Sequence, residues 1–160
     1  MTMGNFSLPQ NCKIVTLLAP AADAAGRTGD YISLKNAHKV WLVFNITNGH
    51  ATATPLSVNK ATAVAPTGAA GLAAVFPIWS NADIAATDTL VRQTDAASFS
   101  TAAAVKDVVV VFEIDPAILG SGFDCIAPVT GASNALNLTS CMAFIQERYQ
   151  QATPPTAILD

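Results

Sequence analysis

The stretch Val108-Val-Val-Val-Phe-Glu-Ile114 decides the fold class of this chain of 160 residues. Its β-branched and aromatic residues are those most enriched in strands, and its length is usual for one strand. A second stretch, Val40-Trp-Leu-Val-Phe-Asn-Ile46, is an almost continuous apolar run. Such a run is typical of a strand that is buried on both faces. The two stretches therefore predict the centre of a β-sheet core.

Further strand-like segments lie on both sides of these two. They alternate apolar with polar residues or are rich in β-branched residues, and Gly, Pro and Asn turn signals separate them. The predicted segments are 12–18, 30–34, 52–59, 72–79, 88–93, 98–100, 123–129 and 139–149. The last segment is long enough for a helix, but its β-rich context favours a strand. About nine short strands at this spacing predict a mostly β, single-domain antiparallel sandwich or barrel.

Turn signals refine this prediction. Asn48-Gly49 is a strong hairpin signal and predicts that 40–46 pairs with 52–59. Residues 19–29 contain Pro20 and two glycines and are predicted to form a loop. Pro116 fits the first position of a short helical turn at 115–119. The domain prediction is an N-terminal arm at 1–11, a β domain at 12–149 and an extended C-terminal tail at 150–160.

The composition favours a protein that packs against others. Charged residues make up only 12% of the chain, against about 25% in typical soluble domains. Hydrophobic residues reach 51%, and alanine alone accounts for about a fifth of the sequence. A surface built from Ala, Thr, Ser and Asn loses few hydrated charges on contact. We therefore expect a homo-oligomer, with a trimer as the leading state.

Composition also argues against several classes of partner. The net charge is −3 and the eight basic residues are scattered, whereas phosphate-backbone binding needs a basic patch. No stretch approaches the roughly 20 apolar residues that span a bilayer, and the N-terminus lacks the pattern of a signal peptide. We expect neither a nucleic acid nor a membrane as a direct partner.

The sequence predicts no catalytic, cofactor or metal site, because each candidate lacks the pattern that its chemistry requires. The three cysteines form no C-x-x-C motif and are expected to be buried thiols, with an intermolecular disulfide as the alternative. No nucleophile elbow, calcium loop or phosphate loop is present. The candidates are His38 and His50, Ser121, a Cys12–His38 pair, the acidic set Asp83, Asp88 and Asp95, and the turn at 68–71. We therefore expect a protein that is not an enzyme.

Two groups of residues are candidates for an interface. Trp41 and Trp79 are expected to be core or interface anchors, and a stacked sugar or base is the alternative. The two chain ends are polar, contain proline and lie outside the strand pattern, so we predict that they act as contact arms. Simple terminal disorder is the alternative. The candidate arm residues are Phe6, Leu8, Pro9, Tyr149, Pro154 and Pro155.

Several stretches together resemble a family of small structural proteins of tailed bacteriophages and prophages, encoded near the major capsid gene. They are Lys13-Ile-Val-Thr-Leu-Leu-Ala-Pro20, Gly29-Asp-Tyr-Ile-Ser-Leu-Lys35, Trp41-Leu-Val-Phe44, Pro77-Ile-Trp79, Asp88-Thr-Leu-Val-Arg92, Gly122-Phe-Asp-Cys125, Thr130-Gly-Ala-Ser-Asn134 and Arg148-Tyr-Gln-Gln-Ala-Thr-Pro-Pro155.

The resemblance covers nearly the whole chain and implies a virion component, in the first place a head decoration (cement) protein on the capsid exterior. It also implies synthesis in the cytoplasm of a bacterial host. Such proteins clamp neighbouring subunits of the major capsid protein, often as trimers. The family offers no functional residues to transfer one by one. A tail or head–tail connector component is the alternative within the virion. A carbohydrate-binding β-sandwich module is the alternative of another class.

Overall fold

Strand β10 (Asp107–Ile114) lies inside the larger of two sheets, between β4 (Ala37–Asn48) and β7 (Ile78–Asn81). Every second side chain of β10 is buried, and Val110, Phe112 and Ile114 have no exposed surface. The intervening side chains are partly exposed. The alternation along β10 therefore places every second side chain in the core and the others on the outward face of the sheet.

The computed structural model describes residues 6–149 and 155–159. Two antiparallel six-stranded sheets run in the orders β1-β12-β4-β10-β7-β8 and β2-β11-β5-β6, with β3 and β9 also in the second sheet, beside β11 and β5. The remaining elements are α1 (Leu8–Asn11), β1 (Cys12–Ala22), β2 (Arg27–Thr28), β3 (Ile32–Ser33), β5 (Pro55–Ala61), β6 (Ala70–Gly71), β8 (Val91–Arg92), β9 (Ser98–Ser100), the 3-10 helix η1 (Pro116–Leu119), β11 (Cys125–Thr130) and β12 (Asn137–Glu147).

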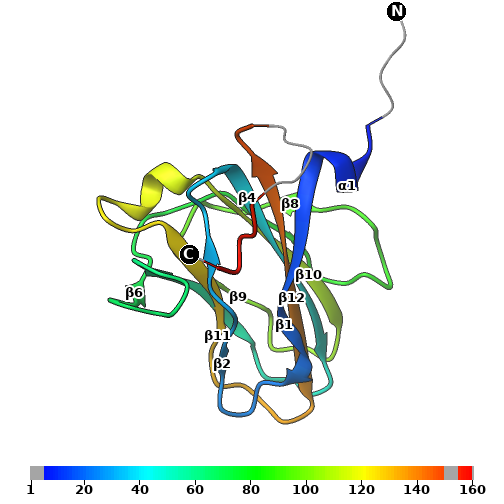
Figure 1. Ribbon diagram of the computed structural model, residues 1–160. Helices are drawn as coiled ribbons and strands as arrows, with labels where there is room; N and C mark the ends of the chain where they lie inside the picture. The colour runs from blue at the N-terminus through cyan, green and yellow to red at the C-terminus, as the bar shows by residue number, and fades with distance from the viewer. Residues whose placement is uncertain (1–5, 150–154, 160) are drawn as a thin grey trace, which may run out of the picture.

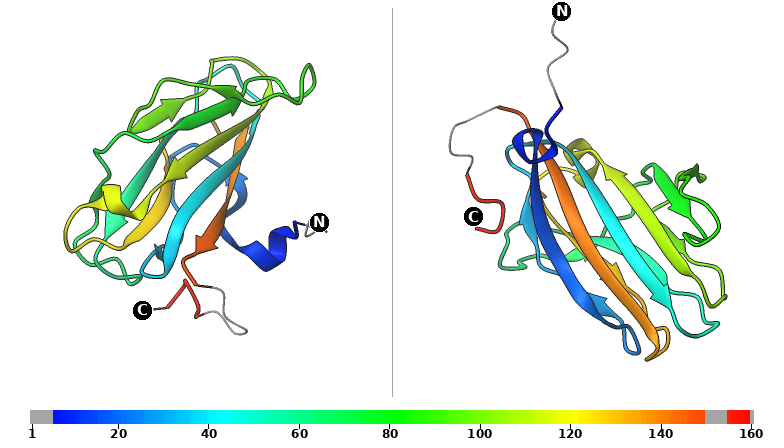
Figure 2. Two further views of the ribbon diagram at one scale, coloured as in Figure 1. Left: turned by 90° about the horizontal axis from the view of Figure 1, so that it is seen from above. Right: turned by 90° about the vertical axis from the view of Figure 1, so that its right-hand side faces the viewer.

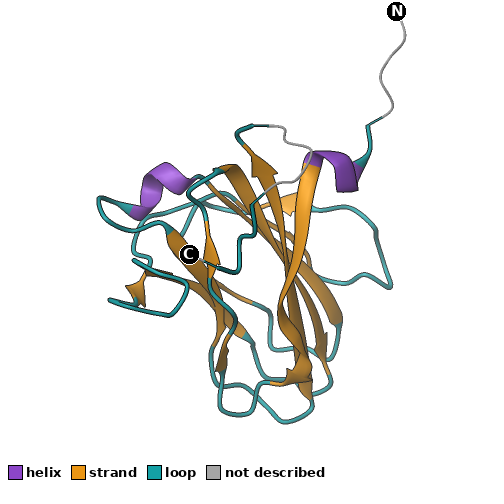
Figure 3. Cartoon of the chain, viewed as in Figure 1, coloured by secondary structure: helices purple, strands orange, loops and turns teal. Residues whose placement is uncertain are grey.

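The two sheets face each other and enclose one main hydrophobic core (Figure 1). Phe112 sits at its middle, with ring centroids 5.1 Å from Phe44 and 4.9 Å from Phe76. Strands dominate, and among the described residues helix occurs in α1 and η1 alone (Figure 3). The predicted mostly β sandwich is confirmed. The strands predicted at 98–100 and 139–149, and the helical turn with Pro116 in its first turn, are confirmed as well.

The predicted hairpin at Asn48-Gly49 is wrong. Strand β4 pairs with β10 and β12, whereas β5 lies in the other sheet beside β11. A tight hairpin of the expected type needs positive φ at both turn residues, and neither Asn48 nor Gly49 has it. The chain instead crosses between the sheets, because the Asn48 side chain is buried in bonds to Thr54 and Thr101.

Strand β4 is not buried on both faces as predicted. Leu42, Phe44 and Ile46 are fully buried, but Trp41 and Val43 are only partly buried and Asn45 is exposed. The outward apolar residues of β4 pack beside residues of the neighbouring strands and not under a second layer. Trp41 lies beside Phe144 and Glu113, and Val43 lies beside Met142 and Val111. The outward face of β4 therefore combines the apolar Trp41 and Val43 with the polar Asn45.

Other corrections concern the lengths of elements. Residues 19–22 are not loop but the end of β1, which tolerates Pro20 because it is an edge strand with an irregular register between Leu18 and Ala21. The segments predicted at 30–34 and 88–93 shrink to the two-residue strands β3 and β8. The N-terminal arm is not wholly irregular, since Leu8–Asn11 forms one helical turn with proline in the first turn.

Candidate interaction surface

The outward face of the large sheet carries a cluster of large apolar side chains among polar ones. We define the outer face as the side chains of this sheet that point away from the small sheet. Cross-strand register brings Ile14, Phe144 and Trp41 side by side, and Met142 beside Val43. The remaining large apolar members are Val109, Val111, Trp79 and Leu138. Charges on it are Lys39, Asp107, Glu113 and Arg92.

In the right-hand view of Figure 2 the large sheet is turned toward the reader, and among the described segments α1 overlaps the upper ends of β1 and β12 while the rest of the strands lie open to view. Ile14, Leu138 and Met142 on this face are 43%, 43% and 39% exposed. Contiguous apolar surface of this kind marks interaction sites on soluble proteins. The outer face is therefore the candidate interaction surface.

Two tryptophans on this face share one carboxylate. Trp41 Nε1 donates to Oε1 of Glu113 at 3.0 Å, and Trp79 Nε1 donates to Oε2 at 2.9 Å. The three side chains come from β4, β10 and β7, so one carboxylate joins three neighbouring strands. The sequence singled out both tryptophans as candidate anchors but gave no sign that Glu113 links them.

The environment of Glu113 favours its charged form. Burial by itself would raise the pKa of this carboxyl, but hydrogen bonds from Trp79 and Trp41 and the charge of Lys39 outweigh it and hold the pKa below its usual value. Lys39 Nζ lies 3.5 Å from Oε1. The cluster therefore keeps a negative charge at neutral pH without leaving it unpaired.

A cation flanks each indole ring. Lys39 Nζ is 5.9 Å from the Trp41 ring centroid, and the Arg92 guanidinium is 5.6 Å from that of Trp79. Arg92 also forms a 2.5 Å ion pair with Asp95. Amphipathic side chains of this kind supply contact area at little entropic cost. The cluster is a rigid, partly polar centre within an apolar surface.

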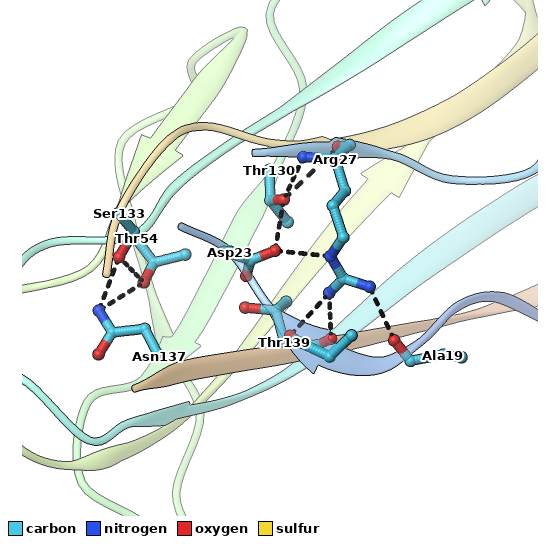
Figure 4. A network of polar contacts seen from close by, with 9 residues as sticks. Ala19, Asp23, Arg27, Thr54, Thr130, Ser133, Asn137 and Thr139 are labelled. Atoms are coloured by element: carbon cyan, nitrogen blue, oxygen red, sulfur yellow. Dashed lines mark hydrogen bonds and ion pairs between the residues drawn. The ribbon is translucent and has the colours of Figure 1, made fainter. Parts of the chain in front are cut away.

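A second feature closes one side of the sandwich, where β1 of the large sheet faces β2 and β3 of the small sheet. The guanidinium of Arg27 donates to the carbonyls of Ala19, Ala21 and Thr139 at 2.9, 3.1 and 2.6 Å (Figure 4). Its Nε donates to Oδ1 of the fully buried Asp23 at 2.8 Å. Arg27 thus covers carbonyls of an edge strand, which would otherwise be open to pairing with another chain.

The same side is closed further along the seam. Asp30 N–H donates to the Leu17 carbonyl at 3.0 Å, and Ser33 N–H donates to the Ala157 carbonyl at 2.7 Å. Ala157 is only 7% exposed and belongs to the main core. The C-terminal tail, predicted as an extended contact arm outside the β domain, therefore places this residue in the core of its own chain, where the edge of β3 gives the tail backbone a hydrogen-bond donor.

Hydrogen bonds between buried polar side chains connect the loops at one end of the sandwich. Asn137 Nδ2 donates to Ser133 Oγ at 2.7 Å and to Thr54 Oγ1 at 3.4 Å (Figure 4). Asn137 Oδ1 accepts from the N–H of His50 at 3.0 Å. These bonds join loops from both sheets, and they assign a structural role to the loop that carries one of the two histidines.

The candidate arm residues are mostly exposed. Phe6 is 75% exposed, Leu8 39% and Tyr149 69%, and Pro9 and Pro155 are exposed as well. Pro154 lies outside the described residues. The structure therefore leaves apolar side chains of both terminal segments available for contact. It does not bring Trp41 and Trp79 together with them in any described contact.

Within the described residues, no group of three or more His, Cys, Asp or Glu side chains could hold a metal ion. Cys125 and Cys141 are buried as expected, whereas Cys12 is only partly buried. Burial raises the pKa of the Cys12 and Cys141 thiols, which disfavours the reactive thiolate. The described part of the chain also contains no helix long and apolar enough to cross a membrane.

Comparison with known proteins gives no family membership. No model of a protein family matches this chain, and no curated protein matches its sequence significantly. Among solved structures, the fold is similar to that of the SPBc2 prophage-derived protein YomS, with a TM-score of 0.47 and 6% sequence identity. The match covers 85% of this chain and 94% of that chain. A likeness of this degree does not support a shared function.

Proposed function

We propose that this chain is a structural protein of a tailed-phage particle, and specifically a head decoration protein that binds the major capsid protein on the outside of the head. The whole-chain resemblance described above supplies the placement in the virion. The single structural observation that supports a binding role is the apolar outer face of the large sheet, which has Ile14, Leu138 and Met142 exposed.

The mechanism is burial of apolar surface across a junction between capsid subunits. Each square ångström of apolar surface removed from water contributes roughly 25 cal/mol before the costs of association are subtracted. A surface with few charges loses little hydration on docking, so most of that contribution is retained. Trp41 and Trp79 fit the role of central anchors, since partly buried aromatics dominate the energetics of interfaces.

The alternative of a carbohydrate-binding module would use the same tryptophans. Sugar recognition needs free polar groups beside an open aromatic face. Here both indole N–H groups are bonded to Glu113, and Lys39 and Arg92 flank the rings. These contacts favour protein binding over sugar binding at this cluster.

Mass spectrometry and cryo-electron microscopy of purified particles test the proposal. We expect the chain at a copy number comparable with that of the capsid subunits, as density on the outer surface of the head. A chain absent from the particle, or present at only a few copies in the tail or connector, would exclude a decoration role. Separate deletion of residues 1–7 and 155–160, followed by particle binding and heat-resistance assays, would show whether the terminal segments contribute.

A further inference from the structure

The C-terminal segment fills a seam between the edges of the two sheets. We define the seam by Lys13 of β1, Ser33 of β3 and Glu147 of β12, which lie around the tail. Lys13 Nζ donates to the carbonyl of Pro155 and pairs with Glu147 Oε1 at 2.7 Å. The Ser33 N–H donates to the carbonyl of Ala157. The tail thus extends the free edge of β3 and inserts one small side chain into the core.

The tail and its seam leave between them a small space of about the size of one water molecule. This cavity of about 20 Å³ is lined by Asn36, Ala37 and Ile145, by the three seam residues and by the tail itself. Within the described part of the chain, the buried Oε2 of Glu147 has no hydrogen-bond partner. One alanine and two hydrogen bonds to the tail backbone hold the segment, so this contact opens more often than the β domain unfolds.

The segment that leaves the seam is apolar beyond its anchor. Ile158 and Leu159 follow Ala157 directly and are 52% and 66% exposed. Five residues, 150–154, connect the end of the described body at Tyr149 to Pro155. Six Cα–Cα steps span at most about 21 Å. The tail can therefore reach an adjacent copy only when the two bodies are in close contact.

We propose that the seam is a docking site for the C-terminal segment of a second copy of this chain, so that adjacent copies exchange residues 155–159. An identical segment makes the same bonds to Lys13 and Ser33 and inserts the same Ala157, so exchange conserves every contact at the seam. Exchange of an identical element is a low-cost route to association. The inference does not depend on the proposed function, because any two copies held close together satisfy its requirements.

The test uses the full chain and a fluorescein-labelled peptide of residues 154–160. In Ala157→Asp, the charged side chain cannot enter the core, so the variant keeps an open seam. Leu159→Asp makes the same chemical change at an exposed site and serves as the matched control. We expect the peptide to bind Ala157→Asp at least about tenfold more tightly than the unsubstituted chain or Leu159→Asp, whose own tails compete at high effective concentration.

Sedimentation velocity across a range of concentrations tests exchange itself. We expect the unsubstituted chain and Leu159→Asp to form an assembly that Ala157→Asp does not form. Equal peptide binding by all three proteins, or an assembly that Ala157→Asp leaves unchanged, would overturn the proposal. If circular dichroism shows that Ala157→Asp does not fold, native mass spectrometry of mixed ¹⁵N-labelled and unlabelled chains tests whether two copies of the unsubstituted chain associate. A strictly monomeric chain at 1 mM would then refute exchange.

Discussion

Arg27 Nε donates a 2.8 Å hydrogen bond to Oδ1 of Asp23, a residue with no exposed surface, while the other guanidinium nitrogens bond three backbone carbonyls. Thr130 Oγ1 donates to the same carboxylate oxygen at 2.8 Å. A fully buried carboxylate is tolerated only when it is paired and hydrogen-bonded. The pair therefore connects β1, β2 and β12 where the edges of the two sheets meet.

The first prediction concerns this pair. Replacing Arg27 by Met leaves the charge of Asp23 buried without its partner, and we expect the free energy of unfolding to fall by about 3–5 kcal/mol. Urea unfolding followed by circular dichroism measures the change. Arg92→Met removes an exposed ion pair and is the control, with an expected loss of at most about 1 kcal/mol. Equal effects of the two substitutions would show that burial of Asp23 contributes nothing.

A second prediction follows from the lowered pKa of Glu113. Because the folded pKa lies below the unfolded value of about 4.3, the stabilisation from this carboxylate is fully present above that pH and is lost as the pH falls through the folded pKa. We expect Glu113→Gln to lower the free energy of unfolding at pH 7 by about 1–2 kcal/mol. The difference between the two proteins should shrink below pH 4.

Urea unfolding monitored by tryptophan fluorescence at several pH values measures this effect, since Trp41 and Trp79 report on the cluster directly. Asp88→Asn removes one negative charge at an exposed position and controls for the change in net charge. A difference between wild type and Glu113→Gln that stays constant from pH 7 to pH 3 would contradict the role assigned to the carboxylate.

The third prediction concerns two glycines. A Cβ atom at Gly49 would lie 2.4 Å from the backbone oxygen of Leu136, whereas one at Gly71 would meet nothing within 4 Å. We expect Gly49→Ala to destabilise the fold by about 1–3 kcal/mol through overpacking, and Gly71→Ala to leave it almost unchanged. Thermal unfolding of both variants measures the contrast. A neutral Gly49→Ala would mean that the crossing between the sheets is less tightly packed than the structure shows.

The fourth prediction concerns the outer face. Met142→Lys places a charge in its middle without touching the core, so we expect stability to change by no more than about 0.5 kcal/mol. Binding to undecorated particles should fall at least about tenfold, because a buried unpaired charge is costly at an interface. Ala117→Lys adds the same charge on the exposed η1 turn and should bind normally. Normal binding by Met142→Lys would exclude the outer face as the contact.

Local patterns in the sequence were sufficient for the fold class. The period-two pattern of 108–114 and the turn signals predicted strands, and the strands predicted at 98–100 and 139–149 are present as Ser98–Ser100 and Asn137–Glu147. Local signals failed where partners come from distant parts of the chain. Asn48-Gly49 reads as a hairpin, but burial of the Asn48 side chain between Thr54 and Thr101 directs the chain across to the other sheet.

The functional candidates divide in the same way. Trp41 and Trp79 were identifiable as anchors because large aromatic residues are few in this chain. Their link through Glu113 was not, since it depends on the order β4-β10-β7. Asp23 and Arg27 are oppositely charged and four residues apart in the sequence. That spacing is typical of an ion pair on a helix and does not predict a contact between the edges of two sheets.

The sequence by itself determined that the chain forms strands, that its surface is poor in charge and that its aromatic residues are few, because these depend only on residue type and local order. Tertiary structure decided which strands are neighbours, which face of the large sheet stays uncovered, and that Ala157 of the tail returns to the core. The physical reason is that each of these depends on a contact between residues far apart in the chain. The alternation of residues along a strand predicts that one of its faces is apolar, but it does not predict which part of the chain packs against that face.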